Sequence, residues 1–560
     1  MDLHAQIRYF SFNVNGAKTL FNYHPWNQLQ GNFNAFLRAV DADIISLQEL
    51  KIQLDTVTQF GLNKDYRSFI LIPKFKKGYS GVGLYVRLPQ QDESPQVQQA
   101  LTVVGAEEGI TGRLKDKIEG VPYMNLPKEQ SIGGYLLAED IAQLELTEQD
   151  MLNLDSEGRC VIAELANNTI VVSLYCPANS MGTPEGQSFR LNFLEVMFRR
   201  CANLEALGKK VVVMGDINVS PDLIDSAETI NELIKKKAVV NNLIEGGSEF
   251  EMVNREACLS FHSSTLHRSL LHKYIFPSLE GAPNCKTQFL FDTTRVVKKR
   301  ELALYTVWNT MTNSRQSNFG SRIDLILISS EEDLRQIKRA ELLSFLHGSD
   351  HCPILTDLCV AHQELHPIKR VNNLSFEAKK FYNLVRHRDI STLFSTAAIK
   401  RSSDSKFLDT SDTSEAEIMN KSEFQTHAKK KKPPASKKLY SGRKAATSNM
   451  SQQPIQNFFF QVRPDNLRHA PQDPGPQETK PLEIKKSEAV DVISQFANLV
   501  YDNPPLCHHN EKCILKTSKT QFSRGKKFWC CARASKGSIE LGDHRCNFFE
   551  WTKKPTDSLN

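Results

Sequence analysis

The sequence lacks a long apolar run, a leader-like start and a disulfide framework. None of its 560 residues fall in a stretch of about 18 apolar residues, the length that a membrane-spanning helix needs. The opening MDLHAQIRYF carries an acid at Asp2 and lacks the basic-then-apolar layout of a secretory signal. Seven of the 12 cysteines are scattered up to Cys359, as buried thiols of an intracellular protein are. We therefore exclude integral-membrane and secreted disulfide-rich classes, and we expect no membrane partner.

The charge balance is only weakly informative. The formal net charge is +6, with charged residues at 24% and hydrophobic residues at 40% of the chain. Such an excess allows a polyanionic partner but does not require one. The length exceeds that of a usual domain, so we expect two or three folded units or one large unit with a tail.

Residues 1–362 read as one globular α/β domain. Short runs rich in β-branched residues alternate with helical patterns at 28–40 and 185–207. Two stretches, 89–130 and 248–299, look like insertions. The predicted strands are 7–14, 42–48, 81–87, 159–165, 169–176, 210–216, 322–329 and 352–358.

The composition changes after residue 362. Residues 400–450 are rich in Ser, Lys, Asp and Thr and hold few large apolar side chains, so they cannot bury enough surface to offset chain entropy. We expect a mostly disordered linker at 363–500, with a short helix at 375–387, and an ordered unit again at 501–555.

Polar side chains collect where the predicted strands begin or end. Reacting groups of α/β proteins are commonly found at such strand ends and in the loops that follow them. Each of these residues alone has an ordinary structural explanation, and it is their joint appearance in order that indicates a site. They are Asn13, Glu49, Tyr175, Asp216, Asn218, Asp324, Asp350 and His351.

Phosphodiester hydrolysis would use all of these side chains. The substrate is an anion and water is a poor nucleophile, so a hard cation, a base near neutral pKa and phosphate donors are needed. Glu49 and Asp350 are suitable ligands for Mg²⁺, with Mn²⁺ as an alternative. His351, oriented by Asp324, can act as base or as an electrostatic clamp. The remaining expected roles are water orientation by Asp216 and Asn218, and phosphate or DNA contacts by Tyr175, Asn179, Asn318 and Arg322.

Seven ordered motifs resemble those of exonuclease III-type AP endonucleases in the endonuclease/exonuclease/phosphatase superfamily. The motifs are NVNG (13–16), LQELK (47–51), GYSGVGLY (78–85), YCPAN (175–179), GDINVSP (215–221), NSRQSNFGSRIDLILIS (313–329) and SDHCP (349–353). The resemblance implies a four-layered α/β sandwich, in which two packed sheets are flanked by helices. It implies incision beside abasic sites, removal of 3′-blocking groups and 3′→5′ exonuclease activity. Carried over by motif, the metal set falls on Glu49, Asn13, Asp350, Asp216 and Asn218, and the catalytic set on Tyr175, Asp216, Asn218, Asp324 and His351.

Three positions depart from the family pattern. Asn15 stands where some members carry Asp, which removes one possible metal charge. Ser321 occupies a position where abasic-site specialists carry a Trp of the sugar pocket, so 3′-end trimming gains weight over abasic incision. Asn179 is displaced by one position from the usual YxPN spacing.

The linker contains two short motifs. SQQPIQNFFF (451–460) matches the pattern Q-x-x-aliphatic-x-x-aromatic-aromatic, which resembles the peptide that docks on the sliding clamp PCNA. The matching residues are Gln452, Ile455, Phe458 and Phe459, within 452–459. The basic run 428–438 fits a nuclear-import signal or a block that binds DNA non-specifically. We expect a nuclear protein, with an additional mitochondrial pool left open.

Five cysteines and several histidines gather between Cys507 and Cys546. A unit this small has little core, so a structural Zn²⁺ would supply much of its folding free energy. The unit resembles the GRF zinc finger, which implies single-stranded DNA binding and places the ligands at Cys507, His509, Cys531 and Cys546, with His508 as rival to His509. Basic residues among aromatic rings fit an electrostatic groove with stacking platforms. These residues are Arg524, Lys526, Lys527 and Arg533.

The nuclease motifs, clamp motif and finger together predict a monomeric DNA-repair hydrolase of base excision repair and the DNA-damage response. Its predicted substrates are abasic, 3′-blocked or recessed DNA. Two rival interpretations remain open at this stage. One is a superfamily phosphodiesterase or phosphatase acting on a non-DNA substrate, and the other is a non-catalytic scaffold that bridges PCNA and single-stranded DNA.

Overall fold

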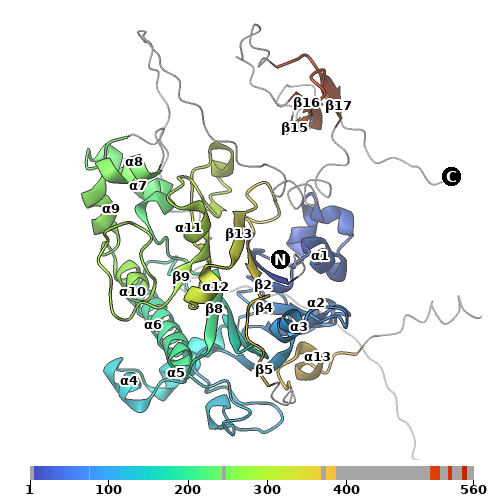
Figure 1. Cartoon of the computed structure of the whole chain (residues 1–560), viewed down its shortest axis with the longest axis vertical. Coiled ribbons are helices and arrows are strands. Elements are labelled where there is room, and N and C mark those ends of the chain that lie inside the picture. The colour runs from blue at the N-terminus through green and yellow to red at the C-terminus, as the bar shows by residue number, and fades with distance from the viewer. Residues whose placement is uncertain are drawn as a thin grey trace, which may run out of the picture. The chain divides into compact units, whose positions relative to one another are not determined.

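A large α/β body and a small C-terminal module are described separately (Figure 1). The computed structural model describes residues 5–74, 76–241, 247–367, 374–385, 505–511, 513–517, 527–531 and 545–551. The α/β body is residues 5–385 of this set, and the C-terminal module is residues 505–551. Residues 386–500 of the predicted linker, which include its basic run and its clamp motif, lie outside the described residues.

The first sheet has six strands and carries the start of the chain. Its central strands β1 and β2 are parallel, and its other neighbours are antiparallel. The strand order is β13 (Ile337–Leu342), β14 (Ile354–Cys359), β1 (Gln6–Asn13), β2 (Ile44–Gln48), β4 (Val82–Arg87) and β3 (Tyr66–Leu71).

The second sheet also has six strands. Its central strands β7 and β8 are parallel and pair Tyr175 with Asp216, whereas β12 pairs Asp324 with Asp216 in the antiparallel sense. This register brings three predicted site residues to one end of the sheet. The strand order is β5 (Val103–Glu108), β6 (Cys160–Leu165), β7 (Thr169–Tyr175), β8 (Lys210–Asp216), β12 (Asp324–Ile328) and β9 (Phe291–Asp292).

The two sheets pack face to face with helices on their outer faces, which confirms the predicted four-layered sandwich. Inward side chains such as Ile44, Val171 and Val212 form one apolar core between the sheets. Helix α1 (Phe33–Val40) buries Phe33, Phe36 and Leu37 outside the first sheet. Helix α6 (Pro184–Ala206), which begins where Thr183 caps the Gly186 amide, covers the second sheet together with α10 (Leu266–Tyr274).

A buried polar latch joins the two sheets inside this apolar core. Ser46 of the first sheet and Ser173 of the second lie 2.6 Å apart through their hydroxyl oxygens. The Gln48 amide donates to Ser46 at 2.6 Å and to Ser11 at 3.1 Å. Because hydrogen bonds are directional and apolar contacts are not, the latch fixes how the sheets align.

The two predicted insertions fold differently. Residues 89–130 supply α3 (Pro95–Leu101) and the edge strand β5, so this stretch is partly an integral piece of the second sheet. Residues 222–241 and 247–302 form a helical lobe with its own small core around Leu223, Phe250 and Phe261. The lobe contains α7 (Ala227–Lys235), α8 (Gly247–Val253), α9 (Arg255–Phe261), α10 and α11 (Thr293–Lys298).

The described chain continues to pack on the body beyond residue 362. Leu374 and Phe376 enter the core between the sheets, and the predicted short helix appears as α13 (Ala378–Phe381). The domain boundary that we predicted at residue 362 is therefore too early. The apolar side chains of this segment stand in a polar stretch of sequence, and such a segment becomes ordered by packing on a tertiary surface. The remaining short elements are α2 (Val57–Gly61), α4 (Ala138–Gln143), α5 (Glu148–Ser156), α12 (Glu331–Leu334), β10 (Val307–Trp308) and β11 (Gly320–Ser321).

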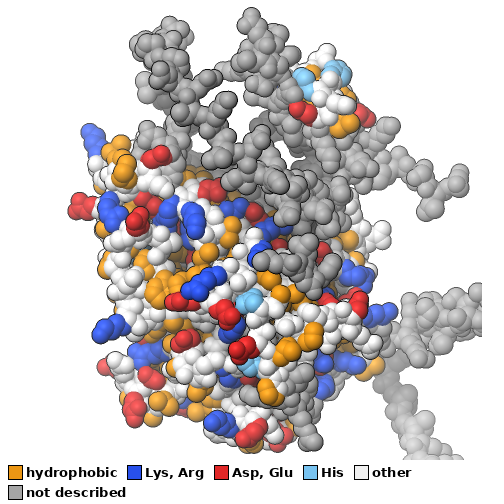
Figure 2. All heavy atoms as spheres, viewed as in Figure 1, with side chains coloured by type: hydrophobic (Ala, Val, Ile, Leu, Met, Phe, Trp, Pro, Cys, Tyr) orange, Lys and Arg blue, Asp and Glu red, His pale blue; other side chains and the backbone are white. Residues whose placement is uncertain are grey.

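The C-terminal module is a three-stranded antiparallel sheet. Its order is β15 (Ile514–Thr517), β16 (Lys527–Cys530) and β17 (Phe549–Trp551). Within the residues that the structure describes, no helix is both long and apolar enough to cross a bilayer. Acidic and basic side chains are interspersed on the face of the α/β body in Figure 2, so surface charge alone does not mark a partner there.

Candidate active site

The predicted site residues meet at one end of the sandwich, and each sheet contributes half of them. The ends of β1 and β2 and the turn before β14 bring Asn13, Glu49 and His351 from the first sheet. The end of β8 and the start of β12 bring Asp216 and Asp324 from the second. The site therefore exists only where the two sheets face each other.

Asn13 links the acidic groups of the two sheets. Its amide donates to Glu49 Oε1 at 3.0 Å and to Asp216 Oδ2 at 2.9 Å, and its Oδ1 accepts from the Asn15 backbone at 3.1 Å. Ligand atoms of Glu49, Asp216 and His351 all lie within 4.8 Å of one another. This spacing and the oxygen-rich donor set suit a hard divalent cation.

His351 is held by a buried carboxylate. Its Nδ1 lies 2.8 Å from Asp324 Oδ2, and its Nε2 faces Asp216 Oδ2 at 3.8 Å. The Thr306 hydroxyl accepts the backbone amide of Asp324 at 3.2 Å, which fixes the start of β12. The imidazole is thus oriented by one aspartate and directed at another.

Burial and crowded negative charge shift the pKa values of this cluster. Burial, reinforced by the charge of Asp324, raises the pKa of Asp216 to about 8. Burial alone would lower the pKa of His351, but the carboxylates of Asp324 and Asp216 outweigh it and raise the pKa to about 10. The cluster therefore contains more negative charge than its own cations balance.

Asp350 reaches the cluster through Asn15. Its Oδ1 accepts from Asn15 Nδ2 at 2.9 Å and from the Ser349 hydroxyl at 3.1 Å. The Lys51 ammonium hydrogen-bonds to Asn15 Oδ1 and lies 2.8 Å from Glu49 Oε2. A neutral Asn at position 15 thus connects Asp350 to Lys51 without adding a charge.

The loop after β8 places Asn218 beside Asp216. The Asn218 backbone amide donates to Asp216 Oδ1 at 2.9 Å, and its side-chain amide donates to the Cys176 carbonyl at 2.8 Å. Asn218 has a φ of 57°, a left-handed conformation that Asn tolerates better than most residues. Both ends of the residue are therefore held in one orientation.

Tyr175 is fixed by an arginine that we did not predict. The Arg159 guanidinium lies 4.7 Å from the Tyr175 ring centroid, donates to the Tyr175 carbonyl at 3.2 Å and hydrogen-bonds to the Tyr79 hydroxyl. Burial raises the pKa of Tyr175 well above its ordinary value, so the phenol stays protonated and can donate. Tyr79 lies inside the GYSGVGLY motif, which was the only sequence signal for this arrangement.

The C-terminal module gathers three thiols and an imidazole. Ligand atoms of Cys507, His509, Cys531 and Cys546 lie within 4.8 Å of one another. His509 Nδ1 is 3.7 Å from Cys507 Sγ and 3.5 Å from Cys531 Sγ. The rival, His508, instead packs its ring edge-on against Phe548. This donor set fits tetrahedral Zn²⁺.

Comparisons with known proteins agree with both parts. Residues 10–351 match the endonuclease/exonuclease/phosphatase family, and residues 505–555 match the GRF zinc finger. The DNA-(apurinic or apyrimidinic site) endonuclease 2 of Saccharomyces cerevisiae is 37% identical over 97% of each chain. The enzyme of the same name from Homo sapiens is 25% identical over 98% of this chain and 99% of its own.

The chain belongs to the AP endonuclease 2 family. It is a hydrolase of the endonuclease/exonuclease/phosphatase superfamily, a DNA-repair nuclease of the AP endonuclease 2 type with a C-terminal GRF zinc finger. The expected identity and enzyme class are thereby confirmed.

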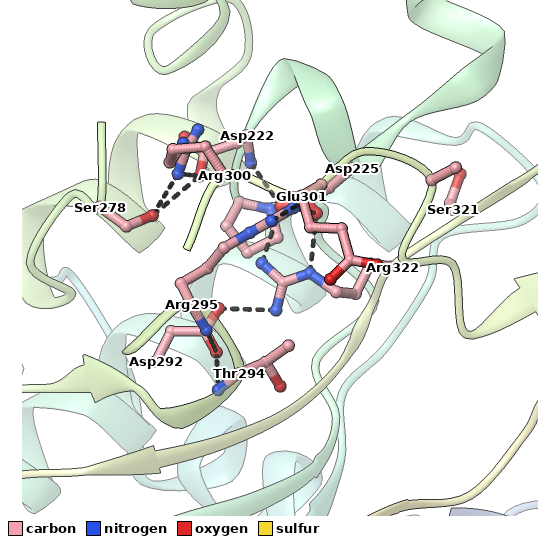
Figure 3. A network of polar contacts seen from close by, with 12 residues as sticks. Asp222, Asp225, Ser278, Asp292, Thr294, Arg295, Arg300, Glu301, Ser321 and Arg322 are labelled. Carbon is pink, nitrogen blue, oxygen red and sulfur yellow. Dashed lines mark hydrogen bonds and ion pairs between the residues drawn. The ribbon is translucent and has the colours of Figure 1, made fainter. Parts of the chain in front are cut away.

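Arg322 of this AP endonuclease 2-type chain does not reach a surface where DNA could contact it. Its side chain is 0% exposed, and it donates to Asp225 at 2.7 and 2.8 Å and to Asp292 at 2.6 Å (Figure 3). Arg295 and Arg300 hold Asp225 and Asp222 in the same network. Our expectation of a DNA contact by Arg322 is wrong, because a guanidinium in a doubly acidic buried pocket binds those carboxylates instead.

The other predicted DNA contacts of this family member have mixed placements. Asn179 is half-buried and donates to the Thr183 carbonyl at 3.2 Å, beside the start of α6. Asn318 is exposed, and its Oδ1 accepts from the buried Trp308 indole at 3.1 Å. The finger residues Arg524, Lys526 and Arg533 lie outside the described residues, as do Gln452, Ile455, Phe458 and Phe459, and of Lys527 only the backbone is described.

Proposed function

We propose that the Asp216–His351 cluster hydrolyses DNA phosphodiester bonds with Mg²⁺. The observation that carries the proposal is the bridge by Asn13 between Glu49 and Asp216, with His351 aligned on Asp324 at 2.8 Å. A scaffold that only bridged other molecules would have no use for so many buried charges gathered at an open strand end.

Each side chain has a chemical role that its contacts support. Asp216 and Asn218 orient the attacking water, and the rigid Asn218 loop keeps that orientation constant. Protonated His351 and Tyr175 donate to the phosphate oxygens on which negative charge develops. Asp324 keeps the His351 ring in place.

Glu49 and Asp216 are the proposed ligands of Mg²⁺, with Asp350 and Asn13 beside it. Their oxygens and the surplus negative charge of the cluster fit a hard cation. When bound, the ion would offset charge on the phosphate in the transition state. Mn²⁺ satisfies the same ligand set.

We further propose that 3′→5′ exonuclease and 3′-phosphodiesterase activities exceed abasic incision. Ser321 lies on β11, paired with Val307, and offers no aromatic wall for an abasic sugar. The neighbouring Trp308 is buried and faces Arg315 at 4.5 Å, so it is occupied by internal packing. Recessed and 3′-blocked ends do not need a sugar pocket of this kind.

The remaining parts of the proposal concern recruitment. Cys507, His509, Cys531 and Cys546 would hold structural Zn²⁺, and the finger would bind single-stranded DNA. Residues 452–459 would dock on PCNA, and the chain would act as a monomer in the nucleus during base excision repair.

A gel assay tests the catalytic proposal. Full-length protein with Mg²⁺ would receive three end-labelled duplexes: an internal abasic site, a recessed mismatched 3′ end and a 3′-blocked nick. We expect fast 3′ trimming and slow abasic incision, both lost in Asp216→Asn. The substitution is a better control than a chelator, which would also remove zinc from the finger.

Other outcomes would change the proposal in distinct ways. Dominant abasic incision would keep the nuclease but overturn the meaning given to Ser321. Turnover of a soluble phosphoinositide without any DNA cleavage would move the activity to a different substrate. Absence of cleavage on every duplex, with PCNA added, would favour the non-catalytic scaffold.

A further inference from the structure

A cluster of two guanidinium groups and an imidazole lies beside the catalytic loop without a counter-anion. It consists of Arg190 on α6 and of His267 and Arg268 at the start of α10. Arg190 is 8% exposed and hydrogen-bonds to the backbone carbonyl of Asn218, so the cluster adjoins the loop that carries Asp216. His267 and Arg268 are only half-buried, so a ligand can reach them from solvent.

Each of the three side chains has a buried nitrogen that lacks a hydrogen-bond partner. These atoms are Arg190 Nε, His267 Nδ1 and Arg268 Nε. The other ends are anchored: His267 Nε2 lies 3.0 Å from the Thr265 hydroxyl, and Arg268 donates to Ser264 Oγ at 2.8 Å. Leaving buried donors unpaired costs free energy, so such groups usually have a partner in the working state of a protein.

The electrostatics of the cluster also point to a missing anion. Among the described residues, no carboxylate forms an ion pair with any of the three, although the charge of Asp216 acts on Arg190. Burial and the two guanidinium charges lower the pKa of His267 to about 3, and burial and Arg190 lower the pKa of Arg268 to about 10. The first turn of α10 contains no acid, and cations at a helix N-terminus oppose its dipole.

We propose that Arg190, His267 and Arg268 form a phosphate-binding site that takes a backbone phosphate of the DNA strand lying across the catalytic loop. Two guanidinium forks and an imidazole with buried, unpartnered nitrogens match the oxygens of a phosphate. The inference rests on the proposed action on DNA, and it adds a contact on the helical lobe that none of the sequence motifs includes. A free phosphate or a released nucleotide presents the same chemistry and is the alternative source.

DNA binding at several salt concentrations tests the site. Full-length protein in an Asp216→Asn background, which leaves DNA uncut, would be titrated onto a fluorescent duplex with a recessed 3′ end. We expect Arg268→Gln to bind about tenfold more weakly, and to flatten the salt slope of the affinity by about 0.9. His267→Gln should act in the same direction more weakly. The control Arg335→Gln removes an exposed charge after α12, and its affinity should match the parent.

Thermal unfolding separates a binding role from a structural one. Without DNA, Arg268→Gln should unfold at the same temperature as the parent or higher, because it relieves repulsion between the guanidinium groups of Arg190 and Arg268. Inorganic phosphate should stabilise the parent more than Arg268→Gln. A lower unfolding temperature with unchanged DNA affinity would overturn the proposal.

Two further outcomes are informative. Stabilisation by phosphate without any change in DNA affinity would assign the site to free phosphate and overturn the DNA contact. Wild-type DNA affinity and salt slope in both Arg268→Gln and His267→Gln, with normal 3′ trimming by wild type, would reject the site and leave the proposed function standing. If wild type itself neither binds nor cuts DNA, the proposed function fails first.

Discussion

Asp216 at the end of β8 and Asp225 in the segment that follows are both fully buried, but the charges around them are of opposite sign. Asp225 is enclosed by Arg295 and Arg322, whose charges overcome the effect of burial and lower its pKa (Figure 3). Asp216 faces Asp324 and Glu49, and its pKa is raised to about 8. The same side chain is thus held by ion pairs where its charge is balanced, and it has the perturbed pKa expected of the proposed reactive group where it is not.

The ion-pair network around Asp225 helps to fix the position of the proposed active-site residues. Arg322 also donates its backbone amide to the Asp225 carbonyl at 2.9 Å, and the Ile217 amide donates to the Ile323 carbonyl at 2.9 Å. These bonds clamp the loop after β8 to the chain that enters β12. The position of Asp324 relative to Asp216 therefore depends on ion pairs that never touch substrate.

The largest expected effect concerns Arg322, whose ion pairs balance the charges of Asp225 and Asp292. Arg322→Gln would leave the buried Asp292 without its ion pair and Asp225 with Arg295 alone, and it should lower the free energy of unfolding by about 3–5 kcal/mol. Chemical denaturation measures this loss. Arg38→Gln is the matched control, because its ion pair with Asp65 is about half exposed on both sides and contributes below about 1 kcal/mol. Equal stability of the two variants would show that the network is not an anchor.

A smaller effect is expected at Asp324, the carboxylate that orients His351. Asp324→Asn keeps the shape of the side chain but removes the charge that orients His351, so 3′ trimming should slow about 10²- to 10³-fold. An Asn oxygen can keep the contact that Asp324 Oδ2 makes with His351, so the unfolding temperature should fall less than in Arg322→Gln. A variant that unfolds much earlier would place Asp324 with the anchors rather than with the reactive groups.

The smallest effect concerns Asp216, whose charge is not balanced, and it is a gain in stability rather than a loss. Between pH about 4 and 8 the folded protein holds a proton on Asp216 that the unfolded chain releases, so stability falls as pH rises through this window. Asp216→Asn removes that cost and, in metal-free buffer at pH 8.5, should raise the unfolding temperature by about 2–4 °C. The gain should vanish near pH 4, and added Mg²⁺ should stabilise wild type but not the variant. Destabilisation at pH 8.5 would contradict the assignment of Asp216 as an unbalanced charge.

Local patterns in the sequence were sufficient for the central strands and for the side chains that meet at the proposed active site. The β-branched run of 210–216 becomes β8, and the polar residues that follow such runs meet because parallel strands end together. Four strands of the two six-stranded sheets escaped prediction: β3, β5, β9 and β13. In β13, IKRAEL alternates poorly because the strand is at a sheet edge and fully buries only Ala340.

Other misassignments arose where a residue's surroundings come from distant parts of the chain. Nothing near Arg322 in the sequence reveals that Asp225 and Asp292 will enclose it, so an arginine in a nuclease motif reads as a DNA contact. His267 and Arg268 lie in the helical lobe and belong to no motif. From the sequence, residues 374–385 belong to the polar linker. In the structure, Phe376 and Phe381 pack into the core of the α/β body.

The polar latch between Ser46 and Ser173 has a consequence for the safety of the genome. An enzyme that cuts DNA is harmful if it acts before it is completely folded or after it begins to come apart. Under the proposed function, the first sheet carries Glu49 and His351 and the second carries Asp216 and Asp324, so neither sheet alone holds a complete site. On that proposal, a chain that is still being synthesised, or one whose layers have parted, cannot cut until both sheets are packed together.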